Sequence, residues 1–325
     1  MAKTSTAKRT ISTEDLKKAI LAVESERLKH PARPRPDRAQ RATLLKGRRE
    51  SEKAYSGFLT KAGLDLKKFG ALQQRRSAEL ERMVATHKAA ALKLATQRKD
   101  TLYSSIAAQS KALSRVAVQG GFQVYQSFTL DTPFLIWSNP LIDLSSAAVP
   151  FGSWAKFNFS MSASQSGSQT VSFYFYWPNP YKDYAVINAA TFMSATGYLR
   201  AHAPWGIGTS ANAVDAYADL IPWFGLPDAT VTFGSEVAFL GSIGAYGGIF
   251  GDDTEGVSIS SGVSLSSSGY AVPPNTTAAF EVTLVVDYAN GGGDVEADFE
   301  SGDFQIACPA VVVWLLNHPP GGAMA

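Results

Sequence analysis

Apolar residues at helical spacing first occur after residue 15. Leu16, Ile20 and Val23 follow Ser12, whose hydroxyl can cap a first turn that carries Asp15 three residues later. Three prolines between residues 31 and 36 remove backbone donors and restrict the residues that precede them. The pattern therefore predicts a capped amphipathic helix that ends before residue 31.

Two more helical segments are predicted before residue 120. Asp37 can cap a second helix, and the stretch 71–119 contains no Gly or Pro and is rich in strong helix formers. A helix of that length would extend about 70 Å, which a small domain cannot surround. We expect a coiled-coil-like stalk, either a helical hairpin or a loose oligomeric bundle, because the apolar positions keep no strict heptad. The second helix would carry Leu44, Leu45, Tyr55, Phe58 and Leu59.

From residue 122 onward the apolar period changes to two. The runs 155–161, 171–177 and 280–288 place large apolar side chains at every second position and end near Gly, Pro, Asn or Ser. Eight to ten such strands are separated by few helical patterns, of which Asn212–Leu220 is the one short helix that we expect. Many short strands without crossover helices predict an antiparallel β-sandwich of the jelly-roll kind.

The expected fold class is α+β with segregated halves. We assign residues 1–118 to a basic helical segment, 119–318 to an acidic, aromatic-rich β-sandwich and 319–325 to a flexible tail. Charge follows the same division, because residues 1–115 carry 27 Lys/Arg against 11 Asp/Glu while the rest carries 3 against 17. The formal net charge of +2 is thus a cancellation. Opposite charges would allow the basic segment to dock on the acidic β-domains of neighbouring copies, and whether the two halves also meet within one chain stays open.

Arginines cluster early in the basic half. Such a cluster can neutralise phosphates and release counterions, which requires positive charge but no particular fold. The alternative is a solvated helical face, because acids are interspersed and no zinc spacing or RNA-binding aromatic motif is present. The residues that would contact phosphate or another anion are Arg33, Arg35, Arg38, Arg41, Arg48 and Arg49.

Compartment signals are few. The single cysteine, Cys308, cannot form an intramolecular disulfide, and its apolar neighbours indicate a buried thiol. The basic first residues lack the apolar stretch of a signal peptide, and no uncharged run has the length of a spanning helix. The default expectation is a soluble, cytoplasmic protein, with non-classical export left open.

No catalytic motif is found: the sequence has no GxSxG elbow, no P-loop and no HExxH pair. We therefore expect no enzymatic activity and no cofactor, with calcium as the one candidate. Asp294, Glu296, Asp298 and Glu300 alternate along one predicted strand face and offer the hard oxygens that calcium prefers. The alternative is a solvated face, or a face that meets Lys or Arg of the helical half.

Aromatic density gives a second candidate site. The outward members of one predicted strand, Tyr174 and Tyr176, could stack against sugars or form an interface, or they could simply fill a core. Arg200 and His202 lie close together near Trp205, an arrangement that a ligand pocket could use. The predicted ligand-binding set is Tyr174, Tyr176, Trp177, Tyr181, Arg200 and His202.

These observations favour a non-enzymatic structural or adhesive recognition protein, in which an oligomerising helical stalk carries a β-sandwich head. The first alternative is a nucleic-acid-binding or packaging, coat-like protein that uses the basic N-terminal arm. The second is a carbohydrate-binding or calcium-dependent ligand-binding module. Homo-oligomerisation and contact with an acidic protein surface are the partner expectations, and no membrane span is expected.

Overall fold

A computed structural model of the chain describes residues 12–29, 60, 66–116, 125–205, 210–226, 231–232, 236–248 and 251–316. Over these residues two helices precede two β-sheets. The helices are α1 (Thr13–Lys29) and α3 (Leu66–Val116). Neither of them is both long and apolar enough to cross a bilayer.

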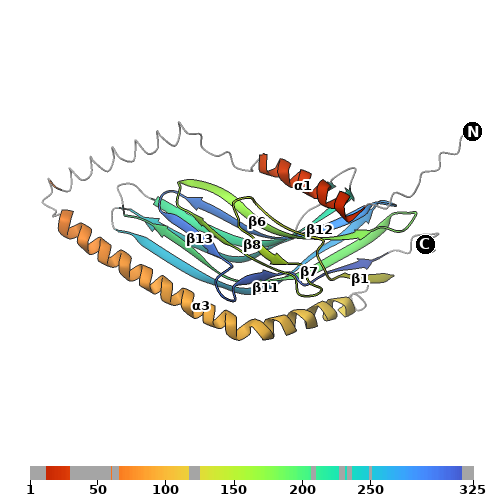
Figure 1. Cartoon of the computed structure of the whole chain (residues 1–325), viewed down its shortest axis with the longest axis horizontal. Helices are drawn as coiled ribbons and strands as arrows, with labels where there is room; N and C mark the ends of the chain where they lie inside the picture. The colour runs from red at the N-terminus through yellow and green to blue at the C-terminus, as the bar shows by residue number, and fades with distance from the viewer. Residues whose placement is uncertain are drawn as a thin grey trace, which may run out of the picture.

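Two antiparallel sheets pack face to face, as the alternating pattern predicts (Figure 1). Sheet A contains β1 (Gln126–Leu130), β3 (Ser145–Ala147), β4 (Trp154–Lys156), β5 (Asn158–Met161), β7 (Ala185–Ala203), β11 (Asp253–Val272), β13 (Asp294–Asp298), β14 (Gln305–Ala307) and β15 (Val311–Leu315). Sheet B contains β2 (Leu135–Ser138), β6 (Gln165–Pro178), β8 (Ser210–Leu226), β9 (Val231–Thr232), β10 (Glu236–Gly247) and β12 (Thr277–Asn290). The antiparallel β-sandwich is therefore confirmed, while jelly-roll connectivity stays a prediction.

In sheet B, β12 lies between β6 and β8, and β10 forms one end of the order β10-β8-β12-β6-β2. In sheet A the long strand β7 pairs along its length with β11, and on its other side with β13, β14 and β15 in turn. The strand β7 thus joins several strands into one sheet, whereas the sequence pattern predicts them only as separate segments.

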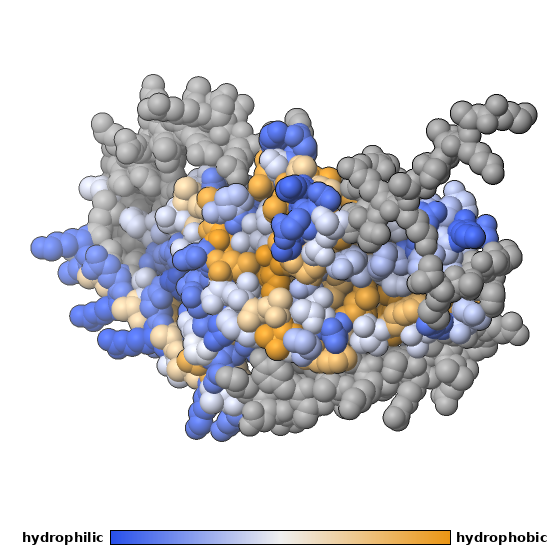
Figure 2. Space-filling model, turned by 45° about the vertical axis from the view of Figure 1, so that its right-hand side comes forward, coloured by the Kyte–Doolittle hydropathy of each residue, from blue (hydrophilic) through white to orange (hydrophobic). Residues whose placement is uncertain are grey.

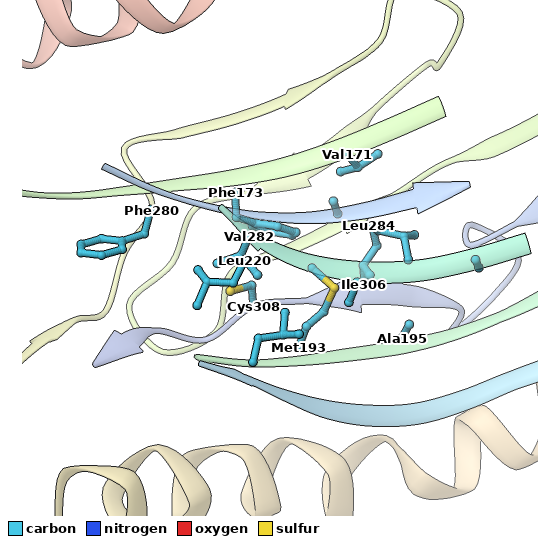
Figure 3. Packing of buried hydrophobic residues seen from close by; sticks show 14 of the residues in the cluster. Val171, Phe173, Met193, Ala195, Leu220, Phe280, Val282, Leu284, Ile306 and Cys308 are labelled. Atoms are coloured by element: carbon cyan, nitrogen blue, oxygen red, sulfur yellow. The ribbon is translucent and has the colours of Figure 1, made fainter. Parts of the chain in front are cut away.

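The main core fills the space between the sheets (Figure 3). The predicted inward rows are confirmed, since Val171 and Phe173 of β6 and Val282 and Leu284 of β12 are fully buried there. Their period of two follows from the alternation of side chains along a strand. Cys308 lies in the same core, and burial raises the pKa of its thiol to about 12.

The helix α1 packs on the outer face of sheet B (Figure 1). Its predicted cap is confirmed, because the Ser12 hydroxyl accepts a hydrogen bond from the Asp15 amide at 3.1 Å and donates to the Asp15 carboxylate at 2.8 Å. Leu16 and Ile20 are buried against the sheet. The first helix of the basic half is therefore part of the β-sandwich surface.

The long helix α3 bends along the opposite side of the molecule, against the outer face of sheet A (Figure 1). Val84 and Ala95 of the helix pack with Tyr198 of β7 and with Phe304. The structure thus does not show the projecting stalk that the uninterrupted helical pattern suggested. A sheet face covers one side of the helix and leaves Leu72 and Met83 exposed on the other.

The helix expected at Asn212–Leu220 is wrong, because these residues lie inside β8. Val214, Ala216, Ala218 and Leu220 are buried at every second position, which is a strand period. Alanine and aspartate lower strand propensity, but here the pairing with β10 and β12 on both sides prevails. The second predicted helix, the boundary at residue 118 and the tail 319–325 lie outside the described residues.

Candidate functional site

A groove of about 470 Å³ opens on the outer face of sheet B, beside the C-terminal end of α1. We call it the sheet B groove. Because successive strand residues point to opposite faces, alternate residues of β6, β8 and β12 form its floor. The side chains that line it include Trp137, Thr170, Tyr217, Asp219, Thr283 and Asp287.

The open part of the floor is acidic. The Tyr217 hydroxyl donates to the Asp287 carboxylate at 3.1 Å, and Ser168 donates to the other oxygen of the same group. Asp215 is paired directly with Asp287 across β8 and β12. Burial, together with the charges of Asp287, Asp219 and Asp215, raises the pKa of Tyr217 to about 12. Tyr217 therefore keeps its proton, and the floor offers carboxylate acceptors beside hydroxyl groups.

An ionic cluster closes the groove where α1 crosses it. The Arg27 guanidinium lies 2.7 Å from the Glu24 carboxylate and 3.1 Å from that of Glu281 on β12. It also lies over the Trp223 ring, 4.5 Å from its centroid, and the indole N–H of Trp223 donates to Glu281 at 3.0 Å. The Tyr174 hydroxyl donates to Glu24 at 2.8 Å. Two carboxylates thus hold the arginine that faces the groove.

Burial sets the protonation behaviour of this cluster. Burial raises the pKa of Glu24 above its ordinary value, and the charge of Glu281 adds to the effect, while Arg27 and Tyr174 oppose it. Burial likewise raises the pKa of Tyr174 far above the ordinary range, with help from Glu281 and Glu24. The tyrosine therefore acts as a hydrogen-bond donor to the carboxylate.

Aromatic side chains flank the acidic floor. Trp137 of β2 lines the groove on one side. On the other side Phe239 of β10, 67% exposed, stands directly opposite Tyr217 in the strand register. Such cross-strand neighbours share one face of the sheet. Figure 2 shows one face of the molecule, where hydrophobic residues reach the surface among hydrophilic ones.

The predicted tyrosine platform needs correction. Tyr174 does point out of sheet B, but α1 covers it and it is fully buried. Trp177 and Tyr181 belong to the main core, as the alternative interpretation allowed. Tyr176 is half-buried and meets the ring of Phe134 edge-on, with the centroids 5.2 Å apart. The sequence could not reveal the cover, because it comes from a helix far away in the chain.

Arg200 and His202 do not join these tyrosines. Both lie on β7 and point out of sheet A, on the other side of the sandwich from Tyr174. Arg200 forms ion pairs with Asp294 of β13 and Glu81 of α3, and the His202 ring nitrogen Nδ1 lies 2.7 Å from the Thr254 hydroxyl oxygen. The predicted ligand set is thus divided between two faces.

The carboxylates of the candidate calcium site contact basic residues. Lys88 of α3 lies 2.8 Å from Glu296 and 2.7 Å from Asp298, which is fully buried, while Asp294 pairs with Arg200. Glu300 lies beyond the end of β13 and is exposed. Among the described residues no group of three His, Cys, Asp or Glu has the arrangement of a metal site. This geometry favours the other interpretation, a face that meets basic residues of the helical half.

Six arginines were predicted to contact phosphate, and they lie outside the described residues. Phosphate contact therefore stays a prediction. It concerns Arg33, Arg35, Arg38, Arg41, Arg48 and Arg49.

Sequence reasoning missed the residues of the sheet B groove. Asp215, Tyr217 and Asp219 alternate with buried Ala216 and Ala218, which is the pattern of a strand with one polar face. Because a helix is expected at Asn212–Leu220, this strand pattern is not recognised from the sequence. For Trp137 the sequence carries no comparable sign, because strand β2 is short and its partner β6 starts about thirty residues later.

No protein-family model matches the chain, and no curated protein sequence matches it. Among solved structures, it is similar to TmCBM61 in complex with beta-1,4-galactotriose, at 10% identity and a TM-score of 0.18 over 53% of this chain and 86% of that one. It is also similar to the mannan-recognising module TmCBM27, at 11% identity and a TM-score of 0.19 over 60% and 99%. The Eiger TNF of S. frugiperda gives 7% identity and a TM-score of 0.21 over 62% and 99%. At TM-scores this low, none of these likenesses supports a functional conclusion for this chain.

Proposed function

We propose that the protein is a non-enzymatic recognition protein whose β-sandwich binds a neutral saccharide in the sheet B groove. The observation that carries the proposal is the lining of the groove, which combines carboxylates and hydroxyls with the aromatic rings of Trp137 and Tyr217. A volume of about 470 Å³ lies within the range of about 300–1,000 Å³ that is usual for small-ligand sites. Carboxylates accept hydrogen bonds from vicinal hydroxyls, and the apolar faces of sugar rings pack on aromatic side chains.

The charge of the groove selects against anionic ligands. Asp219, Glu281 and Asp287 line it, and its arginine, Arg27, is already held by two carboxylates. A phosphate or a nucleic acid would meet a repulsive field there, whereas a neutral polyhydroxylated ligand would not. We accordingly assign the recognition role to sheet B and leave any anion contact to the basic segment.

The test is calorimetric titration of the full chain with a panel of neutral oligosaccharides, namely linear glucans, mannans, xylans and galactans. Saccharide binding at this site should be lost in Trp137→Ala and weakened in Asp287→Asn. The matched control is Tyr246→Ala, because Tyr246 is 74% exposed on β10 and does not line the groove. Equal binding by all three variants, or no heat with any of the sugars, would refute the proposal.

A further inference from the structure

The helix α1 is held by a single stripe of side chains. Leu16, Ile20, Glu24 and Arg27 follow one another at spacings of four, four and three residues, so they share one helical face. The first three are buried, and Arg27 reaches Glu281 at the far end of the stripe. The opposite face is open, as the exposed Leu21 illustrates.

The binding surface for this stripe belongs to sheet B alone. Tyr174, Trp223, Leu226 and Ala279 form the apolar part, and Glu281 supplies the charge that Arg27 meets. The main core between the two sheets forms a separate cluster and contains no residue of α1. The helix therefore packs on the outside of sheet B and contributes nothing to the core between the two sheets.

The chain after α1 is long enough to reach another molecule. Residues 30–65 separate the end of α1 at Lys29 from the start of α3 at Leu66. Even at the 1.5 Å per residue of a helix, a stretch of this length would span about 54 Å. A helix on such a connection can leave its own sheet while α3 stays on sheet A.

We propose that the outer face of sheet B binds α1 of a second copy of this chain, so that two copies exchange their first helices. The partner is fixed by complementarity: two apolar residues enter the aromatic floor, and a cation enters between Trp223 and Glu281. In a single copy the tether gives the chain's own α1 a high effective concentration. Exchange of α1 between two copies is therefore expected to prevail in two situations. One is a variant whose α1 cannot bind its own sheet B, and the other is a high protein concentration.

A charge-reversal pair tests this exchange with full-length chains. In Arg27→Glu, the new carboxylate faces Glu24 and Glu281, so the chain's own helix is repelled. In Glu281→Arg, the new guanidinium repels the chain's own Arg27. Mixing the two restores one native contact, because α1 of the second variant meets the native face of the first. We expect each variant to sediment as a monomer at low concentration and the mixture to double in mass.

The control is the double variant R27E/E281R, in which both reversals sit in one chain and should return the protein to a monomer. A mixture that stays monomeric, although circular dichroism shows both variants folded, overturns the proposal.

A second measurement keeps the test decisive if the buried reversal at position 281 prevents folding. A labelled peptide of residues 12–29 is titrated into the full-length Arg27→Glu chain, whose sheet B face is native. We expect the native peptide to bind about tenfold or more tightly than the same peptide carrying R27E. Equal binding of both peptides, or binding of neither, overturns the proposal.

Discussion

The amine of Lys88 lies 2.7 Å from the carboxylate of Asp298, so a residue of the long helix neutralises a fully buried acid of β13. Asp298 also accepts hydrogen bonds from the amides of Glu300 and Ser301, both at 2.9 Å. The same lysine lies 2.8 Å from Glu296. The basic helical half and the acidic sandwich are therefore joined at this point within one chain.

Removing the charge of Lys88 should destabilise the protein. Lys88→Met keeps the apolar stem but leaves the Asp298 carboxylate buried without its cation, which costs about 1–3 kcal/mol. The measurement is the free energy of unfolding from urea titrations. Lys93→Met is the control, because Lys93 lies on the exposed side of α3. An equal loss in both variants would show that the ion pair has no role in holding the helix.

The buried Glu24 should make stability rise as the solution becomes more acidic. Burial, followed by the charge of Glu281, raises its pKa above the ordinary 4.5. The folded state therefore binds the proton more tightly than the unfolded state. This contribution is complete below pH 4.5 and is lost as the pH rises through the raised value. The urea midpoint of the native chain should therefore fall relative to that of Glu24→Gln as the pH rises through this window. The exposed control Glu26→Gln should keep a constant difference from the native chain.

Asp298 should act in the opposite direction. Burial by itself would raise its pKa, but the hydrogen bonds from Lys88, Ser301 and the amide of Glu300 outweigh it and lower the value below 3.8. Its contribution is present above pH 3.8 and is lost as the pH falls through the lowered value. Hydrogen exchange during acidification should therefore expose the amides of α3 before those of α1. In Asp298→Asn this acid-dependent difference should disappear, and its persistence would contradict the assignment.

The alternation of apolar residues predicted the inward rows of the sandwich because side-chain direction along a strand is a local property. Phe173 and Val282 point into the core for that reason alone. The cap at Ser12 is equally local. Tyr174 shows where such reasoning ends, because its cover is a helix placed by the tertiary fold. The sequence alone does not distinguish Lys88 from the other lysines of α3, because its ion pair depends on how the helix packs against β13.

The close approach of β7 and β13 depends on a glycine. A Cβ at Gly197 would lie 2.5 Å from the Phe299 ring and 2.8 Å from the carbonyl oxygen of Asp298. Gly197→Ala should therefore cost about 1–3 kcal/mol through overpacking. Gly152→Ala is the control, because the nearest atom to a Cβ there is 3.8 Å away. Chemical denaturation of both variants measures the difference, and equal stability would show that the strands can separate without cost.

Cys308 should report on opening of the whole sandwich. It is fully buried between the sheets, within 3.5 Å of the Thr191 hydroxyl, and burial raises its pKa to about 12. Because the thiolate is the reactive form, the native chain should not react with a thiol-specific disulfide reagent at mildly alkaline pH. The same chain in urea should react at once, and the native rate should follow global unfolding as urea is added. Rapid labelling of the thiol without denaturant would instead reveal local opening of the segment between β14 and β15, which contains Cys308.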